Sequence, residues 1–87
     1  MTPAEARALQ DARGYAMAGR VVYGPHAKER MLERKVKSED VIAALTTANV
    51  CEGALKGRWK MTGTDRSGDS LTLIVKVVGG VLVLTVY

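Results

Sequence analysis

The residues best suited to chemistry in this sequence are His26, Arg30 and Arg34, which follow one another at intervals of four positions. In a helix, at about 100° of rotation per residue, this spacing places the three side chains one above another on a single face. His26 is the only histidine. An unperturbed imidazole pKa of about 6.5 lets it give or take a proton near neutral pH. Guanidinium groups match the geometry of phosphate oxygens, so the spacing indicates a site for an anionic ligand.

Basic charge is concentrated around these residues. The chain has a net charge of +4, and the segment 20–37 accounts for all of it, with six basic residues against two acidic ones. Concentrated positive charge favours a polyanion or an acidic protein as the partner. Lys28 lies within this segment and is a further candidate for binding phosphate.

The element that must position these side chains is a short helix over residues 26–35. It follows a strand candidate at 20–23, which is rich in β-branched and aromatic residues and ends at Gly24-Pro25. A further helix begins at Ser38, which is a good N-cap because its hydroxyl can accept a hydrogen bond from the first turn.

An earlier helix is predicted at the N-terminus. Thr2 is an N-cap candidate, Pro3 suits the first helical position, and a glutamate is placed to complete a capping box. The helix should end between residues 14 and 19, and its small apolar side needs something to pack against. We therefore divide the chain into an N-terminal helical extension, 1–19, and a domain, 20–87.

The period of the apolar residues changes from helical to alternating after Asn49. The strand candidates are 50–55, 57–62, 71–78 and 81–87. The apolar run from 71 to 87 is no membrane span, because it is short, contains Lys76 and is interrupted by two glycines.

Gly79-Gly80 predicts a two-residue hairpin loop, which fixes the pairing of the last two strands. One surface of the hairpin is then entirely apolar and must face the core, whereas the other is mixed and can line a groove. Lys76 and Tyr87 lie on the groove side. The expected pairs are Val77–Leu82, Val75–Leu84 and Leu73–Val86 on the core side, and Val78–Val81, Lys76–Val83, Ile74–Thr85 and Thr72–Tyr87 on the groove side.

The preceding strand is placed by pairing Thr64 with Ser70 across a turn of odd length. In this register Arg58 and Lys60 join Lys76 on the groove side, and the strand's apolar residues, Trp59 among them, face the core. Arg58 would then lie opposite Lys76, and like charges across strands destabilise a sheet unless an anion lies between them.

Composition sets further bounds. Eighty-seven residues make one domain with a thin core, so a partner or a second copy of the chain would add useful burial. A content of 47% hydrophobic and 25% charged residues is ordinary for a globular protein and argues against disorder.

Cys51 is the only cysteine, which excludes an internal disulfide and suits a reducing compartment. One cysteine and one histidine cannot build a structural zinc site. The N-terminus has no signal-peptide pattern, so we expect a cytoplasmic protein.

Several short motifs together resemble a known family: His26-Ala27, Arg30-Met31 and Glu33-Arg34, then Ser38-Glu39-Asp40-Val41, and finally Leu84-Thr85-Val86-Tyr87. They are similar to a bacterial family of small domains of unknown function that is grouped with RelE-like toxins, with a layout like that of the MqsR and BrnT toxins. The resemblance covers residues 20 to 87. Gly24 departs from the family, in which a serine or threonine commonly precedes the Pro-His step, and so lacks a hydroxyl cap.

The resemblance implies an α+β fold with two or three helices packed on one face of a twisted antiparallel sheet of about four strands. It also implies a type II toxin that cuts messenger RNA without a metal or other cofactor and is neutralised by an acidic antitoxin. Such cleavage needs a base for the 2′-hydroxyl proton, cations for the phosphate and an acid for the leaving oxygen. The catalytic candidates are His26, Arg30, Lys60 and Tyr87. The candidates for binding phosphate are Arg34, Arg58, Lys76 and Lys28.

Structural roles compete with these functional ones. A lone histidine at a helix start is commonly a capping or packing residue, and arginines on one helix face are commonly a solvated surface. Trp59 could stack a base if the register were shifted by one residue. The rival function is a non-catalytic basic domain that binds RNA or an acidic protein, and a third is a DNA-binding regulator, for which no recognition helix can be named.

Overall fold

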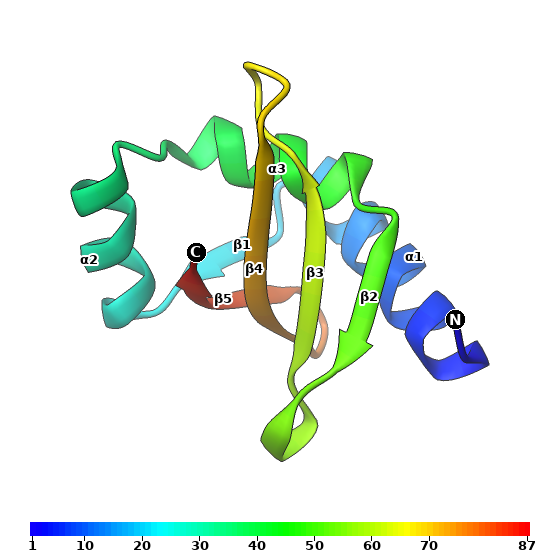
Figure 1. The fold of residues 1–87 in the computed structure, drawn as a ribbon. Helices are drawn as coiled ribbons and strands as arrows, with labels where there is room; N and C mark the ends of the chain where they lie inside the picture. Colours follow the sequence, from blue (N-terminus) through cyan, green and yellow to red (C-terminus); the bar gives the residue numbers. More distant parts are fainter.

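The structure is a computed structural model that describes residues 1–87. Its strands form one sheet in the order β1-β5-β4-β3-β2, in which β1 and β5 are parallel and the other pairs antiparallel. α1 and α3 pack together behind the sheet, and α2 lies beside the end of β5 (Figure 1). The elements are α1 (Pro3–Met17), β1 (Val21–Tyr23), α2 (Pro25–Arg34), α3 (Ser38–Thr47), β2 (Val50–Gly53), a 3₁₀ turn (Leu55–Gly57), β3 (Trp59–Thr64), β4 (Ser70–Val77) and β5 (Val81–Val86).

The predicted α+β fold class is confirmed, with two differences in the sheet. It has five strands instead of about four, and it is mixed instead of purely antiparallel. Both differences come from β1, which joins the edge of the sheet by pairing in parallel with β5. A parallel neighbour needs a long crossover, and here α2, α3 and three strands separate the two partners in sequence.

α1 begins with the predicted capping box. The Thr2 hydroxyl accepts a hydrogen bond from the Glu5 N–H at 3.1 Å, and the Glu5 carboxylate accepts one from the Thr2 N–H at 2.7 Å. The buried side of the helix consists of Ala8, Ala12 and Ala16. Because these side chains are small, α1 packs closely on α3 and β2 and shares one apolar core with the sheet.

α3 starts differently from the prediction. Its N-cap is Lys37 instead of Ser38, because the Asp40 carboxylate accepts a hydrogen bond from the Lys37 N–H at 3.0 Å and closes the first turn. The Ser38 hydroxyl donates to Glu39 instead. Further along, α3 lies directly on Gly63 of β3, where a Cβ atom would collide with the backbone of Ala44.

The β4–β5 hairpin has a loop of three residues, Val78 to Gly80, and not the predicted two. The Val81 N–H donates to the Arg20 carbonyl at 2.9 Å, so pairing with β1 sets where β5 begins. Val81 therefore lies opposite Val77. The predicted pairing of Val81 with Val78 is wrong.

An irregularity between Ile74 and Val75 restores the predicted register in the second half of the hairpin. The pairs Ile74–Thr85 and Leu73–Val86 are confirmed, whereas Val75 faces Val83 and leaves Leu84 without a partner. In the first half of β5, the residues that face the core are therefore the ones predicted to face the groove. The predicted pairs Lys76–Val83, Val75–Leu84 and Val77–Leu82 are wrong: Val81 and Val83 are buried in the core, and Leu82 pairs with Lys76.

Candidate functional site

The side of the sheet away from α1 and α3 carries Lys60 and Lys76, two of the predicted cations; we call it the open face. Lys60 pairs with Ile74 on β4 and with Glu52 on β2. Residues paired directly across strands share a side of the sheet, so these three side chains lie together. Lys76 pairs with Leu82 on the same side.

Arg58 lies just outside the strand ladder. The predicted pair Thr64–Ser70 is confirmed, and the pairing of β3 with β4 ends at Trp59 and Val75. Continuing this register by one residue would place Arg58 opposite Lys76, as predicted, but the two residues are not paired across the strands. The Arg58 Nε atom is buried and has no hydrogen-bond partner, which leaves a cationic donor unsatisfied at this end of the open face.

The opposite end of the open face has hydroxyl groups. The Thr62 and Thr72 hydroxyls are 2.9 Å apart, and the Tyr87 N–H donates to the Thr72 carbonyl at 2.9 Å. This hydrogen bond agrees with the predicted proximity of Thr72 and Tyr87. The Tyr87 side chain stays half exposed at the end of the sheet.

Arg30 ties α2 to the end of β5. Its Nε donates to the Val86 carbonyl at 3.2 Å. The Val86 carbonyl and the Tyr87 N–H belong to the same peptide group and point in opposite directions. Because the Tyr87 N–H donates to Thr72 of β4, the Val86 carbonyl points away from β4, toward the edge occupied by β1. β1 ends at Tyr23 and cannot reach it. α2 therefore takes the place of β1 beside the last residues of β5, and Arg30 supplies the missing donor.

The two flanks of α2 face opposite sides of the sheet. Val22 pairs with Leu82 on the open face, so Tyr23, the next residue of the strand, points to the core side. Tyr23 lines a hollow with Lys28 and Met31, which places that flank of α2 on the core side.

His26 and Arg30 lie on the other flank of α2, because each is about 160° around the helix from Lys28. His26 and Arg30 therefore lie on the flank of α2 away from Lys28, and the hydrogen bond to the Val86 carbonyl holds Arg30 beside the end of β5, next to Tyr87.

The candidate residues form a surface and not an enclosed cleft. His26 is exposed, and its Nδ1 is 3.9 Å from Glu29 Oε2, within ion-pair range when the imidazole is protonated. Arg34 is exposed in the last turn of α2. None of the three principal hollows of the molecule is lined by His26, Arg30, Lys60 or Tyr87. Ligands would therefore reach these groups from open solvent.

Two groups with shifted pKa values lie away from this surface. Burial, and then the nearby Glu39, raises the pKa of Tyr23. Burial raises the pKa of Cys51 as well, followed by the charges of Glu5 and Glu52, so its thiol stays protonated. No group of three or more His, Cys, Asp or Glu side chains is placed to hold a metal ion. No helix is both long enough and apolar enough to cross a membrane.

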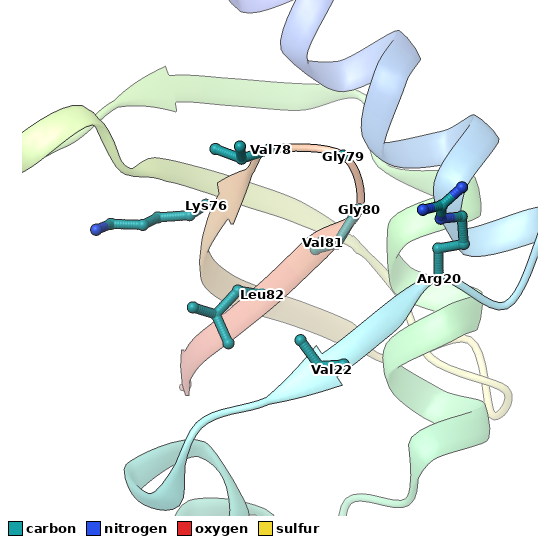
Figure 2. Close-up of a pocket in the computed structure, with 8 residues that line it drawn as sticks. All are labelled: Arg20, Val22, Lys76, Val78, Gly79, Gly80, Val81 and Leu82. Carbon is teal, nitrogen blue, oxygen red and sulfur yellow. The ribbon is translucent and has the colours of Figure 1, made fainter.

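The sequence did not predict the hollow beside the β4–β5 turn, which we call the hairpin hollow (Figure 2). It has a volume of about 400 Å³. The expected register paired Leu82 with Val77 on the core side, whereas the observed register brings Leu82 to the open face beside Lys76. The lining residues are Arg20, Val22, Lys76, Val78, Gly79, Gly80, Val81 and Leu82.

Comparison with known proteins gives one match. A family model described as a domain of unknown function, DUF4258, matches residues 23–87. No curated protein and no solved structure matches the chain. The matched residues run from the end of β1 through β5 and include α2 and the whole cationic part of the open face. The chain therefore belongs to the DUF4258 family of domains of unknown function.

Proposed function

We propose that this domain binds single-stranded RNA on its open face and cleaves it without a metal ion, acting as the toxin of a toxin–antitoxin pair. The observation that supports the proposal is the hydrogen bond from Arg30 to Val86. It holds α2 against the end of β5, and we infer that this brings the His26 imidazole and the Arg30 guanidinium to the side of the sheet that carries Lys60 and Lys76. A face with cations and an imidazole has the groups that phosphodiester cleavage requires, which are a proton acceptor and positive charge for the phosphate.

The proposed reaction uses the neighbouring 2′-hydroxyl of the RNA as the nucleophile. His26 takes the 2′-hydroxyl proton at Nε2, while Nδ1 faces Glu29. The 2′-oxygen attacks phosphorus, the bond from phosphorus to the 5′-oxygen breaks, and Tyr87 gives that oxygen a proton. The products are a 2′,3′-cyclic phosphate and a 5′-hydroxyl end. Arg30 and Lys60 stabilise the negative charge that grows on the phosphate oxygens.

Arg30 is well suited to this role because only Nε is bound to the protein. No hydrogen bond or ion pair engages its two terminal nitrogens, so they are free to form a fork with phosphate oxygens. The Val86 carbonyl also restricts the side chain, which lowers the entropy lost when a phosphate binds.

The test is an assay of the purified chain with a labelled single-stranded RNA in excess EDTA. We expect products with 2′,3′-cyclic phosphate ends, and we expect His26→Ala to slow their formation by about 10²–10⁴-fold while RNA binding persists. Equal cleavage by wild type and His26→Ala would refute the assigned role of His26.

Two lysines provide a matched pair for the binding step. Lys60 and Lys28 are both exposed, but Lys60 lies on the open face whereas Lys28 lines the hollow next to Tyr23 and Met31. Lys60→Ala should weaken RNA binding and lower the slope of log affinity against log salt by about 0.7, the value for one phosphate contact on a single strand. Lys28→Ala should leave both quantities unchanged. Equal effects of the two variants would show that the open face is not the RNA surface.

A second candidate is RNA binding without cleavage. The specific observation in its favour is that no hollow encloses His26, Arg30 or Tyr87, whereas cleavage gains from a site that excludes water. In that case the lysine pair behaves as above but RNA stays intact. Induced expression separates the two in cells. A nuclease arrests growth and degrades RNA, and His26→Ala abolishes both effects, whereas a binding domain gives no RNA decay.

A further inference from the structure

The hairpin hollow has an exposed apolar floor. Val22 is 61% exposed and Val78 87% exposed, and Leu82 lies half-buried between them. No helix covers this side of the sheet (Figure 2). Single exposed aliphatic residues are ordinary, but a group of them around one hollow marks an interaction surface.

Two cations flank this floor. Figure 2 shows Arg20 and Lys76 on opposite sides of the hollow, with the Lys76 side chain directed away from Arg20 and the Arg20 side chain directed along α1. The Arg20 guanidinium lies over the ring of Tyr15, with its central carbon 6.0 Å from the ring centroid, and this contact restrains it. Neither cation forms a salt bridge, and none of the eight lining residues is acidic. The hollow thus presents an apolar centre between two unpaired positive charges.

We propose that the hairpin hollow binds a short acidic segment of a partner protein. An aliphatic side chain of that segment would rest on Val22, Val78 and Leu82, and carboxylates on either side would meet Arg20 and Lys76. Charge complementarity supports this occupant, since opposite charges across an interface steer and orient the partner. This inference does not depend on RNA cleavage.

Two other occupants fit the hollow less well. Nucleic acid bases bind by stacking on aromatic rings, and no aromatic residue lines the hollow. A second copy related by two-fold symmetry would bring two Arg20 side chains and two Lys76 side chains into one interface, in a chain whose net charge is already +4. Like charges would oppose that contact.

The test uses the full chain labelled with nitrogen-15 and a capped peptide of alternating glutamate and leucine. A peptide of alternating lysine and leucine is the charge control. We expect the glutamate peptide to shift the amide signals of Val22 and residues 78–82, and the lysine peptide to bind at least about tenfold more weakly. No shift at these amides, or equal binding of the two peptides, would overturn the proposal.

Two exposed aliphatic residues make a matched pair of variants. Val78 lines the hollow, whereas Leu55 is 85% exposed on the turn between β2 and β3 and lies outside it. Val78→Asp removes part of the apolar floor and repels a carboxylate, so it should weaken binding of the glutamate peptide by about tenfold or more. Leu55→Asp makes the same charge change elsewhere and should have little effect. If both variants weakened peptide binding equally, the interaction would be non-specific charge attraction and the proposal would be wrong.

Further outcomes distinguish an acidic peptide from RNA or a second copy of the chain in the hollow, and distinguish this inference from the proposed RNA cleavage. A single-stranded oligouridylate whose affinity falls with Val78→Asp as much as that of the glutamate peptide would make the hollow an RNA site. A dimer that Val78→Asp dissociates would make it a contact between copies. Either result would overturn the assignment. Arg20→Gln should weaken peptide binding and leave RNA cleavage unchanged, because Arg20 is not part of the proposed RNA surface.

Discussion

Gly63 is the point at which α3 rests on the sheet, and adding one methyl group there should destabilise the fold severely. A Cβ atom at this position would collide with the Ala44 carbonyl oxygen and would lie 2.8 Å from the Ala44 carbonyl carbon and 2.9 Å from the Ala48 nitrogen. All three are backbone atoms, two of Ala44 in α3 and one of Ala48 directly after it, so no side-chain rotation can relieve the contact. In Gly63→Ala the helix must move away from β3.

The expected loss follows from what α3 buries. Its side chains Val41, Ala44 and Leu45 are at most 1% exposed, so moving the helix opens gaps along its whole contact with the sheet. Overpacking a core costs about 1–3 kcal/mol, and we expect about 3 kcal/mol or more here because the obstacle is backbone. For a domain of this size that lowers the Tm by about 12–24 °C. Thermal and urea unfolding followed by circular dichroism would measure it.

Gly53 provides the matched control on the same sheet. It lies on β2, and a Cβ added there would meet nothing within 4 Å. Gly53→Ala should therefore be neutral or stabilise by up to about 1 kcal/mol, through the lower entropy of the unfolded chain. A Gly63→Ala protein with the Tm of the wild type would refute the packing of α3 on β3 described above.

The remaining predictions concern the helices. Gly14→Ala lies in α1 with no neighbour near the added methyl group, and it should raise the free energy of unfolding by about 0.5–1 kcal/mol in urea titrations. Gly24→Ser should stabilise by about 0.5 kcal/mol, because the N-cap of α2 has extended dihedrals and lacks a side-chain hydrogen bond. Hydrogen bonds from the backbone N–H groups of Lys37 and Arg66 lower the pKa of Asp40. That carboxylate contributes its full stabilisation above its unfolded pKa of about 3.9, so Asp40→Asn should lower the Tm at neutral pH. The difference should shrink as the pH falls below about 4 and vanish once the pH is below the lowered pKa of the folded state.

Each of these has an informative control. Gly24→Ala adds the methyl group without the hydroxyl, so a gain equal to that of Gly24→Ser would show that no cap forms. A lower stability of Gly14→Ala would contradict the open space beside α1. If the Tm difference for Asp40→Asn persisted unchanged at acid pH, the carboxylate would not be what holds the start of α3.

The helices and the last three strands could be predicted because their signals are local. The capping box at Thr2 and the pairing of Thr64 with Ser70 follow from residues close in sequence, and both are confirmed. The register of β5 could not be predicted in this way. It depends on the hydrogen bond between Val81 and Arg20, which joins distant parts of the chain, and Gly79-Gly80 is compatible with both loop lengths.

In the candidate site, too, the local features could be predicted and those that depend on distant contacts could not. The spacing of His26 and Arg30 put them on one helix face, but their side of the sheet depends on how α2 meets β5. Lys28 is as basic and as near in sequence, and only the packing of Tyr23 and Met31 shows that it faces the other way. The hairpin hollow gave no signal because its floor exists only in the observed register.

The pairing of β1 with β5 has a consequence for synthesis on the ribosome. β1 is translated before the other four strands, yet its one neighbour in the sheet is β5, the last of the five, and Arg30 likewise binds a carbonyl of β5, that of Val86. While the chain is still growing, neither β1 nor α2 has the partner that positions it. The imidazole and the guanidinium of α2 therefore reach their places only after Val86 has left the ribosome, and until then the growing chain presents α2 without the strand that orients it.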